Sequence, residues 1–549
     1  MKNTYIFKQV SSLAKVFPDD DITRFEELNK LSALKGERLS YQIIYKCDSE
    51  KRWLGATATA VTDERIPVEI KRVGCVPSMF PCLNRECDEW YLRKNPGMFP
   101  DVLYEMPDGK FDIIRENYHS LLITAFIPED IEAGVYPVNI KIQVGEDIMD
   151  NVFEIKVLDE KLSEKKVNFT QWFHGDCIAT YYKYDILSEE HWAMMDKFIE
   201  KAAHIGINMI LTPMFTLPLD TEVGLERPTL QLVDVYRKNG EYSFGFDKMK
   251  RWIDICKKHG MEFFEMSHLF SQWGTGFAPK IVAETENGTE KIFGWHTKAL
   301  SDEYQEFLNN FIPALTDFLK AEGIFDKTYF HISDEPNYEK HHEIYTAERK
   351  MLSGLIPDDR FFEACSDYRW YEEGTVSKPV AITCKVDEFY EHGHKDIWAY
   401  YCCGPCDRGY GNRLFGMPAG RNRINGMQLY KYDIDGFLHW GYNFYYTELS
   451  RKAINPFFDT DASEGFQSGD SYSVYPGEDG PLDSMRSVVF YESLQDYRAC
   501  RTLEKYIGKD EVDKILNSEG ELKFNEFPRT DEGVLALRNK IYDRLEKEL

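Results

Sequence analysis

Apolar residues in the N-terminal part of the chain form short strand-like runs separated by turn-rich stretches. Between about residues 38 and 158 the runs are LSYQIIYK, TATAVT, PVEIKRVG, HSLLITAFI, VYPVNIKIQV and NVFEIKVLD. VNIKIQV and VFEIKV alternate apolar and polar residues, as strands do when one face lies in a core and the other in water. The pattern predicts a β-sandwich. Before it, DDDITRFEELNKLSALKG has an acidic first turn and ends on Gly36, which predicts a helix.

After a polar segment at 158–168 the pattern changes to apolar strands that alternate with helices. The strand candidates are FTQWFH, NMILTP, EFFEMSH, TYFHIS, FFEACS, VAITCKV, IWAYYCC and GFLHWGY. Helical stretches such as SEEHWAMMDKFIEKAAHIG, with a Ser cap and a closing Gly, follow most of them. This alternation predicts a (β/α)8 barrel. An open doubly wound sheet would call for a glycine-rich phosphate turn after its first strand, and WFHGDC offers none.

The length of 549 residues is enough for two or three domains. We predict an α/β protein in three parts. Residues 1–160 form a β-sandwich domain that includes the helical segment, residues 165–508 form the (β/α)8 TIM barrel, and residues 509–549 form a helical C-terminal tail. We expect the chemistry in the barrel, at the C-terminal ends of its strands.

Composition argues against several classes of function. The 66 basic and 93 acidic residues give a net charge of -27, which repels nucleic acid and anionic membranes. The N-terminus MKNTYIFKQVSSLAKVFPDD lacks the apolar core of a signal peptide, and nowhere do about 18 apolar residues follow one another. The 12 cysteines are scattered along the chain. We therefore expect a cytoplasmic protein, although an exported one whose leader has been removed would look the same.

Polar and aromatic residues gather at the carboxyl ends of the predicted strands, where barrels of this type place their reacting groups. Aromatic rings offer flat faces to the C–H faces of sugars, and carboxylate, imidazole and amide groups bind hydroxyls. We therefore expect a carbohydrate-binding pocket built from strand ends and the loops that follow them, with these candidates: His174, Asp176, His268, Trp273, Trp295, His331, Tyr401, Trp440, Tyr442, Asn443 and Tyr472.

The adjacent carboxylates Asp334 and Glu335 are the sharpest feature of this set. Consecutive strand residues point to opposite faces, so both can share one pocket only where the strand breaks, and Pro336 marks such a break. Adjacent carboxylates are poorly placed to flank both faces of a sugar. They suit a mechanism in which Glu335 is the acid/base and Asp334 orients a substrate acetamido group that attacks the anomeric carbon. A structural pair, with Asp334 as a helix cap, is the alternative.

A metal site is a weaker interpretation of the histidines. His174 and His268 could ligate an ion together with Asp176 or Glu265, but neither lies in an H-x-x-H or H-E-x-x-H spacing. We favour hydrogen bonds to the substrate and expect neither a metal nor another cofactor.

Several segments resemble the catalytic domain of glycoside hydrolase family 123. They are QWFHGDCIATYYKYDILSEEHW, NMILTPMFTLPLD, EMSHLFSQWG, YFHISDEP, GFLHWGYNFYY and GDSYSVYPG, in this order over about 300 residues. The resemblance implies a retaining exo-β-N-acetylgalactosaminidase or hexosaminidase that works through an oxazolinium intermediate. Asp334 then matches the residue that stabilises the acetamido group, and Glu335 matches the general acid/base.

Two further hypotheses stay open. An ordinary retaining or inverting glycosidase would use Glu335 as the acid and a second carboxylate, such as Glu265 or Asp176, on the opposite side of the sugar. A non-catalytic carbohydrate-binding protein could use the same barrel, because a fold does not determine a function. Neither the glycosidic linkage nor the oligomeric state follows from the sequence.

Overall fold

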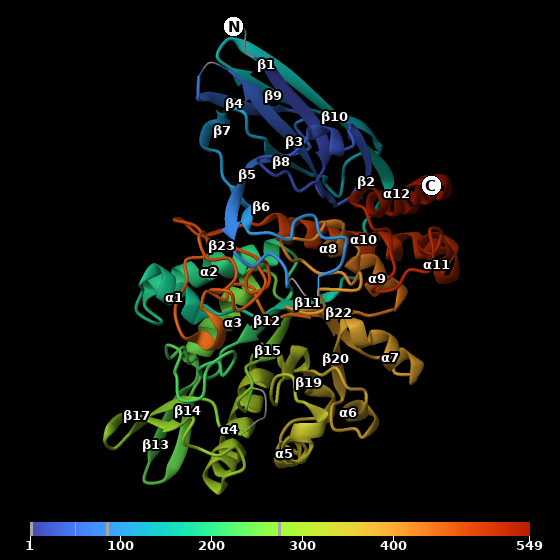
Figure 1. The fold of residues 1–549 in the computed structure, drawn as a ribbon. Helices are drawn as coiled ribbons and strands as arrows, with labels where there is room; N and C mark the ends of the chain where they lie inside the picture. The colour runs from blue at the N-terminus through green and yellow to red at the C-terminus, as the bar shows by residue number, and fades with distance from the viewer. Residues whose placement is uncertain (1–3, 50, 84–86, 273–275) are drawn as a thin grey trace.

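The N-terminal region consists of two five-stranded sheets (Figure 1). The computed structural model describes residues 4–49, 51–83, 87–272 and 276–549. One sheet has the order β1 (Thr4–Ser11), β3 (Arg38–Asp48), β8 (His119–Phe126), β5 (Val68–Ser78) and β6 (Gly97–Tyr104). The other has the order β2 (Lys30–Lys35), β10 (Asp147–Lys161), β9 (Gly134–Val144), β4 (Trp53–Val61) and β7 (Lys110–Ile114). Tyr41 of β3 stacks on Phe153 of β10 with ring centroids 4.0 Å apart, so the two sheets share an apolar core.

The helix predicted over residues 19–36 is wrong. Only a single 3-10 turn, η1 (Ile22–Arg24), forms there, and residues 30–35 form the strand β2. This strand pairs in parallel with β10, and Leu31, Ala33 and Leu34 are buried. Tertiary pairing has overridden the local helical signal, because these apolar side chains are buried only when the segment is extended.

The second part of the chain is a mixed α/β structure around an eight-stranded parallel barrel. The strand order is β18 (Thr328–Phe330), β15 (Phe263–Met266), β12 (Met209–Thr212), β11 (Asn168–Gln171), β22 (Gly436–His439), β21 (Trp398–Tyr400), β20 (Lys378–Ile382) and β19 (Phe362–Ala364). All eight strands expected from the sequence are present. A single parallel bridge between Phe330 and Phe361 joins β18 to the β19 side, so the barrel is nearly closed and is consistent with a TIM-type fold.

Helices follow the barrel strands along the chain, as a parallel sheet requires. They are α1 (Gly175–Tyr182), α2 (Glu189–His204), α3 (Asp247–Lys258), α4 (Asp302–Ala321), α5 (Tyr338–Met351), α6 (Arg369–Glu372), α7 (Val386–Glu391), α8 (Gly420–Arg423) and α9 (Asn425–Lys431). Ser188 and Ser301 cap α2 and α4 by accepting backbone N–H bonds, as predicted from their Ser residues.

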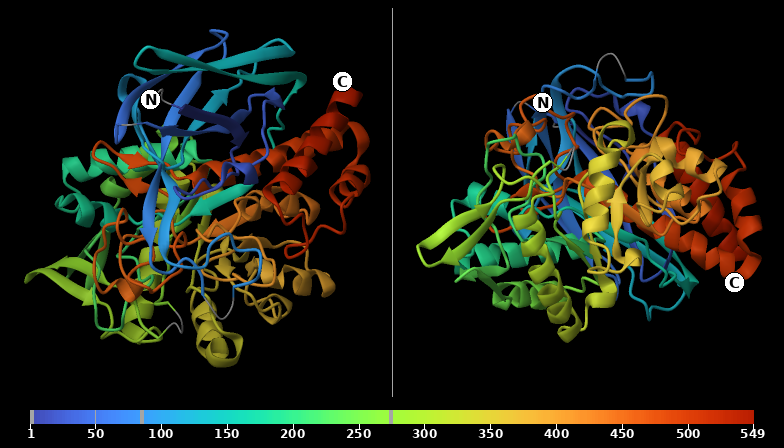
Figure 2. Two further views of the ribbon diagram at one scale, coloured as in Figure 1. Left: turned by 45° about the horizontal axis from the view of Figure 1, so that its top comes forward. Right: turned by 90° about the horizontal axis from the view of Figure 1, so that it is seen from below.

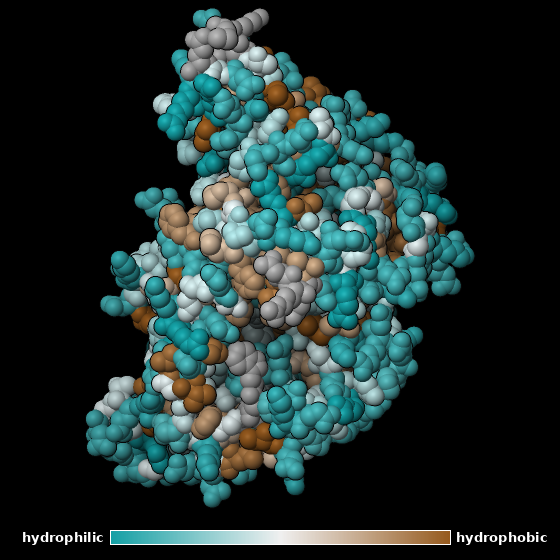
Figure 3. Space-filling model, in the orientation of Figure 1, coloured by the Kyte–Doolittle hydropathy of each residue, from teal (hydrophilic) through white to brown (hydrophobic). Residues whose placement is uncertain are grey.

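A small four-stranded sheet that the sequence pattern did not predict projects from the barrel at the lower left of Figure 1. Its order is β14 (Glu241–Gly245), β13 (Asp234–Lys238), β16 (Ile281–Thr285) and β17 (Gly288–Phe293). Tyr242 and Phe244 of β14 pack against Phe307 of α4. Hydrophilic side chains cover most of the face shown in Figure 3, and apolar ones gather in small patches.

The C-terminal helices are α10 (Met485–Ile507), α11 (Lys509–Leu516) and α12 (Asp531–Glu548). In Figures 1 and 2 α10 lies between the N-terminal strands and the barrel. At this junction the buried guanidinium of Arg486 donates to both carboxylate oxygens of Asp101, at 3.0 and 2.9 Å. Nothing in the described ranges is a helix long and apolar enough to cross a membrane.

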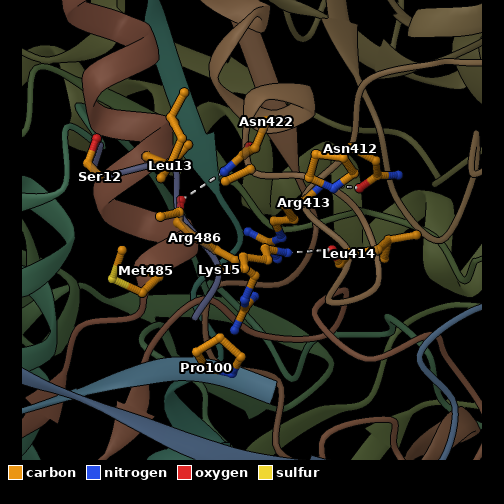
Figure 4. A pocket seen from close by; sticks show the side chains of 14 residues that line it. Ser12, Leu13, Lys15, Pro100, Asn412, Arg413, Leu414, Asn422, Met485 and Arg486 are labelled. Atoms are coloured by element: carbon orange, nitrogen blue, oxygen red, sulfur yellow. Dashed lines mark hydrogen bonds between the residues drawn. The ribbon is translucent and has the colours of Figure 1, made fainter. Parts of the chain in front are cut away.

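A cavity lies at the same junction (Figure 4). Lys15 of the N-terminal region reaches across it and donates to the backbone carbonyls of Leu414 and Phe415 at 3.2 and 3.0 Å. Burial lowers the pKa of Lys15 to about 8, and the charges of Asp101 and Asp531 offset this desolvation only in part. The junction is therefore held by charged groups as well as by apolar packing.

Candidate active site

A second cavity, of about 620 Å³, opens at the carboxyl ends of the barrel strands. Its wall carries four carboxyl groups, those of Asp220, Asp334, Glu335 and Asp470. Trp172, Tyr400, Trp440 and Phe466 supply aromatic surface to the same wall. The mixture of carboxylates and rings on this wall suits a sugar.

Asp334 and Glu335 reach this one cavity because the backbone turns sharply between them and the strand. The strand β18 ends at Phe330, and Glu335 has φ 47°, in the left-handed region that non-glycine residues rarely adopt. Glu363 fixes the approach to the turn by accepting the backbone N–H groups of Ile332 and Ser333 at 2.9 and 3.2 Å. The sequence expectation that a strand break brings the two carboxylates to one pocket agrees with this placement.

The two carboxylates have different surroundings. The side chain of Asp334 is buried and accepts a hydrogen bond at 2.6 Å from Nε2 of Gln272. Burial first, and then the nearby charge of Glu335, raise the pKa of Asp334 well above its ordinary value. Glu335 is exposed to the cavity and accepts a hydrogen bond at 2.6 Å from the hydroxyl of Tyr400. One acid is therefore held in the wall and the other is exposed at the opening.

The two other acids of the cavity are also buried. Burial raises the pKa of Asp220 to about 6 and that of Asp470 to about 7. Oδ2 of Asp470 accepts a hydrogen bond at 3.1 Å from Nε1 of Trp440, which orients the half-buried indole along the cavity wall. Burial is the main cause of both pKa shifts, and at Asp470 the charge of Glu335 adds to it.

A buried charge cluster lies beneath the cavity. His331 donates from Nε2 to Glu265 at 2.7 Å and from Nδ1 to Glu363 at 3.0 Å. Burial alone would lower the pKa of His331, but the hydrogen bonds to Glu265 and Glu363 raise it to about 10. The imidazolium is thus sandwiched between two carboxylates, and Glu265 also accepts bonds from Thr170 and Trp172.

The same cluster bears on the metal interpretation. Ligand atoms of His268, His331 and Glu363 lie within 4.8 Å of one another. However, the rings of His268 and His331 are stacked 4.2 Å apart and only 12° from parallel, so their in-plane lone pairs cannot point at one ion. Both nitrogens of His331 already donate to carboxylates. This geometry favours charge pairing between His331 and Glu363 over a metal site shared by the three residues.

His331→Leu should lower the free energy of unfolding by about 3 to 5 kcal/mol, because it leaves two buried carboxylates without their partner. Urea denaturation at neutral pH measures this, with His296→Leu, at an exposed position, as the control. In the native chain the stabilisation is fully present below about pH 6.5 and is lost as the pH rises toward the raised pKa of His331. Equal midpoints for the two variants would contradict the assignment.

His174 lies on the cavity wall in a fixed tautomer. Its Nδ1 faces the guanidinium of Arg227 at 3.1 Å, and because a guanidinium can only donate, Nδ1 is the acceptor. Nε2 therefore carries the proton and donates to the carbonyl of Trp440 at 3.0 Å. Burial and the charge of Arg227 lower the pKa of His174 to about 3, so the ring is neutral.

Asp176 and Asn443 lie outside the cavity and hold its base together. Asp176 is buried and forms a two-pronged ion pair with Arg227, at 2.8 and 2.6 Å. The side-chain amide of Asn443 clamps the backbone N–H and C=O of His174, at 2.8 and 3.1 Å. Neither group is free to bind a substrate, so the prediction of direct contact does not fit their placement.

Three tyrosines predicted to bind substrate point into the core instead. The hydroxyls of Tyr401, Tyr442 and Tyr472 donate to groups of the protein at 2.7 or 2.8 Å, and all three side chains are buried. Side chains of successive strand residues face opposite sides. Tyr400 faces the barrel interior with Trp172, and Tyr401 therefore faces the surrounding helices. Strand-end placement alone could not decide which of the two neighbours enters the pocket.

The remaining predicted residues divide into four cases. Trp440 lines the cavity, whereas His268 and His331 lie buried beneath it. Trp295 lines a neighbouring pocket, where its Nε1 donates to the carbonyl of Leu225 at 2.8 Å. Trp273 lies outside the described residues.

Several residues of the cavity are absent from the candidate set: Asp220, Gln272, Tyr400, Phe466 and Asp470. Two of them are direct neighbours of predicted residues, since Gln272 precedes Trp273 and Tyr400 precedes Tyr401. Asp470 occurs in the segment GDSYSVYPG. Asp220 and Phe466 lie in long loops whose paths no periodic pattern predicts.

Comparisons with known proteins identify the family and the fold. The family model for the catalytic domain of glycoside hydrolase family 123 matches residues 172–503. A similar solved structure is that of a family 123 glycoside hydrolase from Clostridium perfringens, studied for glycolipid glycan hydrolysis. The two chains are 15% identical, and the match covers 99% of this chain and 98% of that chain with a TM-score of 0.75. At this identity the match shows a shared fold. A GH10 xylanase with a bacterial Ig-like domain from termite gut is 10% identical over 86% of this chain and 100% of that chain, with a TM-score of 0.33 too low to carry weight. No curated protein sequence matches the chain.

Proposed function

The chain belongs to glycoside hydrolase family 123, and from that premise we propose that it is a retaining exo-β-N-acetylhexosaminidase, with N-acetylgalactosamine as the favoured sugar. That it is a glycoside hydrolase with a carbohydrate substrate follows from the family. The observation that supports the finer proposal is the pair Asp334 and Glu335 in one cavity, with one side chain buried and the other exposed.

Each carboxylate would have its own task. Glu335 protonates the glycosidic oxygen as the C–O bond breaks, while the carbonyl oxygen of the substrate's 2-acetamido group attacks the anomeric carbon from the opposite face. Asp334 accepts the acetamido N–H and stabilises the positive charge of the oxazolinium ion that forms. Glu335, now ionised, takes a proton from water as the water opens the oxazolinium, so the anomeric configuration is retained.

The surroundings of the two acids favour this division. Glu335 is exposed at the opening, where a leaving group and then a water molecule can reach it, and Tyr400 holds one of its oxygens. Asp334 lies deeper, where low polarity strengthens a hydrogen bond to the acetamido group. We propose that the indole of Trp440 provides the platform for the sugar ring.

A second candidate is a glycosidase with a separate protein carboxylate opposite Glu335. The acids first considered for that role do not reach the cavity wall, because Glu265 is fully buried beneath it and Asp176 is paired with Arg227. Asp220 and Asp470 do line the cavity, and this placement favours them as alternatives. Such an enzyme would need no acetamido group on its substrate.

A panel of aryl glycosides tests the proposal. We expect turnover of aryl N-acetyl-β-galactosaminide or glucosaminide, no turnover of the 2-hydroxy or α-linked analogues, and inhibition by an N-acetyl sugar thiazoline. The thiazoline resembles the oxazolinium ion, so it should bind more tightly than substrate. Turnover of 2-hydroxy sugars without thiazoline inhibition would favour the second candidate. Binding of saccharides with no hydrolysis of any member would contradict both.

A further inference from the structure

The side-chain amide of Gln272 connects two segments of the cavity wall. Its Oε1 accepts the backbone N–H of Asp220, in the loop after β12, and its Nε2 donates to Oδ2 of Asp334 at 2.6 Å. No other described side chain donates to the carboxylate of Asp334, and no hydrogen bond reaches its Oδ1 from the described residues. The only protein contact that orients this carboxylate therefore comes, within the described ranges, from Gln272.

The orientation of the amide follows from its partners. A backbone N–H can only donate, so the group that faces Asp220 is the amide oxygen, and the NH2 group must face Asp334. Asp220 is itself held in place by the loop that carries Leu449 and Ser450. The backbone carbonyl of Asp220 accepts a hydrogen bond from the hydroxyl of Ser450 at 2.5 Å, and its carboxylate Oδ2 accepts one from the backbone N–H of Leu449 at 3.0 Å. The hydrogen bond from Asp220 therefore fixes the amide of Gln272, so that its NH2 group, and not its oxygen, faces Oδ2 of Asp334.

We propose that Gln272 is a positioning residue for the hydrolysis, which holds Oδ2 of Asp334 and so leaves Oδ1 as the acceptor for the acetamido N–H of the substrate. The inference rests on the proposed function, in which Asp334 meets the acetamido group. A donor at Oδ2 fixes the plane of the carboxylate and stabilises its ionised form, which burial and the charge of Glu335 both disfavour.

The chemistry of the cavity explains why an amide suits this position. With four carboxyl groups on the wall, a fifth at residue 272 would add negative charge beside Asp334. A lysine would neutralise Asp334 but could not accept the N–H of Asp220, and it would compete with the substrate for the same carboxylate. Glutamine satisfies both neighbours without a charge.

Gln272→Leu removes the donor and keeps the approximate volume of the side chain. We expect kcat on the aryl N-acetyl-β-hexosaminide to fall by about 10- to 100-fold, because the carboxylate of Asp334 is no longer correctly oriented. KM should change much less, because Trp440 still provides the platform for the sugar ring. The acid limb of the kcat/KM profile should move to higher pH, because Asp334 loses a hydrogen bond to its ionised form. The control is Gln305→Leu, at an exposed position on α4.

A conservative variant separates positioning from folding. In Gln272→Glu the introduced carboxyl group can still donate to Asp334 while it is protonated, whereas its ionised form repels Asp334. This variant should retain more activity than Gln272→Leu at mildly acid pH and lose that advantage as the pH rises. A structural role alone predicts no such pH-dependent rescue, so its absence in a folded variant would overturn the inference.

A double-mutant cycle identifies the route of the effect. If Gln272 acts through Asp334, adding Gln272→Leu to Asp334→Asn should change kcat by less than about threefold, whereas two independent losses would multiply. Multiplying losses, or a folded Gln272→Leu variant with native kcat and acid limb, would overturn the inference. Failure of the proposed function has a different signature. Turnover of 2-hydroxy sugars without thiazoline inhibition would refute the acetamido mechanism, and the same cycle on that substrate would still report whether the two residues are coupled.

Discussion

Glu335→Gln should lower kcat on an N-acetyl-β-hexosaminide with a poor leaving group by about 10²- to 10⁴-fold while the chain stays folded. The amide keeps the shape of Glu335 and can still face Tyr400, but it cannot deliver a proton to the glycosidic oxygen. Steady-state kinetics on an alkyl glycoside measures the loss. The matched control is Glu546→Gln on α12, where the exposed carboxylate contacts Lys156 far from the cavity.

The leaving group distinguishes an acid from a residue that merely shapes the site. A dinitrophenyl group departs without protonation, so on that substrate Glu335→Gln should slow bond cleavage much less. Hydrolysis of the oxazolinium ion still needs a base, so the second step should become limiting. An equal loss on both substrates would argue that Glu335 contributes to binding or folding and is not the proton donor.

Asp334→Asn should lower kcat on the same N-acetyl substrates by about 10²- to 10³-fold, because the acetamido N–H would then meet a neutral amide and the oxazolinium charge would lose its counter-charge. The pKa of Asp334 is raised by burial and by Glu335. Activity of the native chain should therefore fall as the pH drops through that raised value, well above the range of an ordinary aspartate. The kcat/KM profile measures this.

The variant gives a second readout of the same carboxylate. In Asp334→Asn the part of the acid limb that belongs to Asp334 should disappear, leaving a flatter profile at low pH. Asp147→Asn, at an exposed position at the start of β10, should leave both the rate and the profile unchanged. An acid limb that persists unchanged in the asparagine variant would assign it to another group, such as Asp470.

Much of the barrel could be predicted from the sequence, because its strands are buried on both faces and their apolar runs are short and bounded by helical patterns. The strand β2 could not be predicted, since its alternation of Leu31 and Ala33 is brief and its partner β10 lies more than 100 residues later. The sheet β14-β13-β16-β17 is also absent from the prediction, because β13, β14 and β17 consist mostly of exposed or half-buried residues and resemble polar loops in sequence.

The site shows the same division. The placement of Asp334 and Glu335 in one pocket followed from a local rule about strand breaks. Side chains along a strand point alternately to its two faces, so a shift of one residue in the strand exchanges the faces of Tyr400 and Tyr401. The sequence does not determine this register, and it therefore could not show which of the two tyrosines enters the pocket. The place of Gln272 depends on contacts between segments far apart in the chain, and one sequence contains no signal for such contacts.

The pairing of Arg486 with Asp101 has a consequence for any attempt to isolate the hydrolytic part of the chain. Arg486 also donates to the carbonyls of Gly469 and Tyr472, which flank Asp470 on the cavity wall. A chain shortened to begin near Asn168 would leave this guanidinium without its carboxylate partner, beside the segment that carries Asp470. The β-rich N-terminal region is therefore a structural support of the cavity, and the two parts should be expressed, engineered and exchanged as one unit.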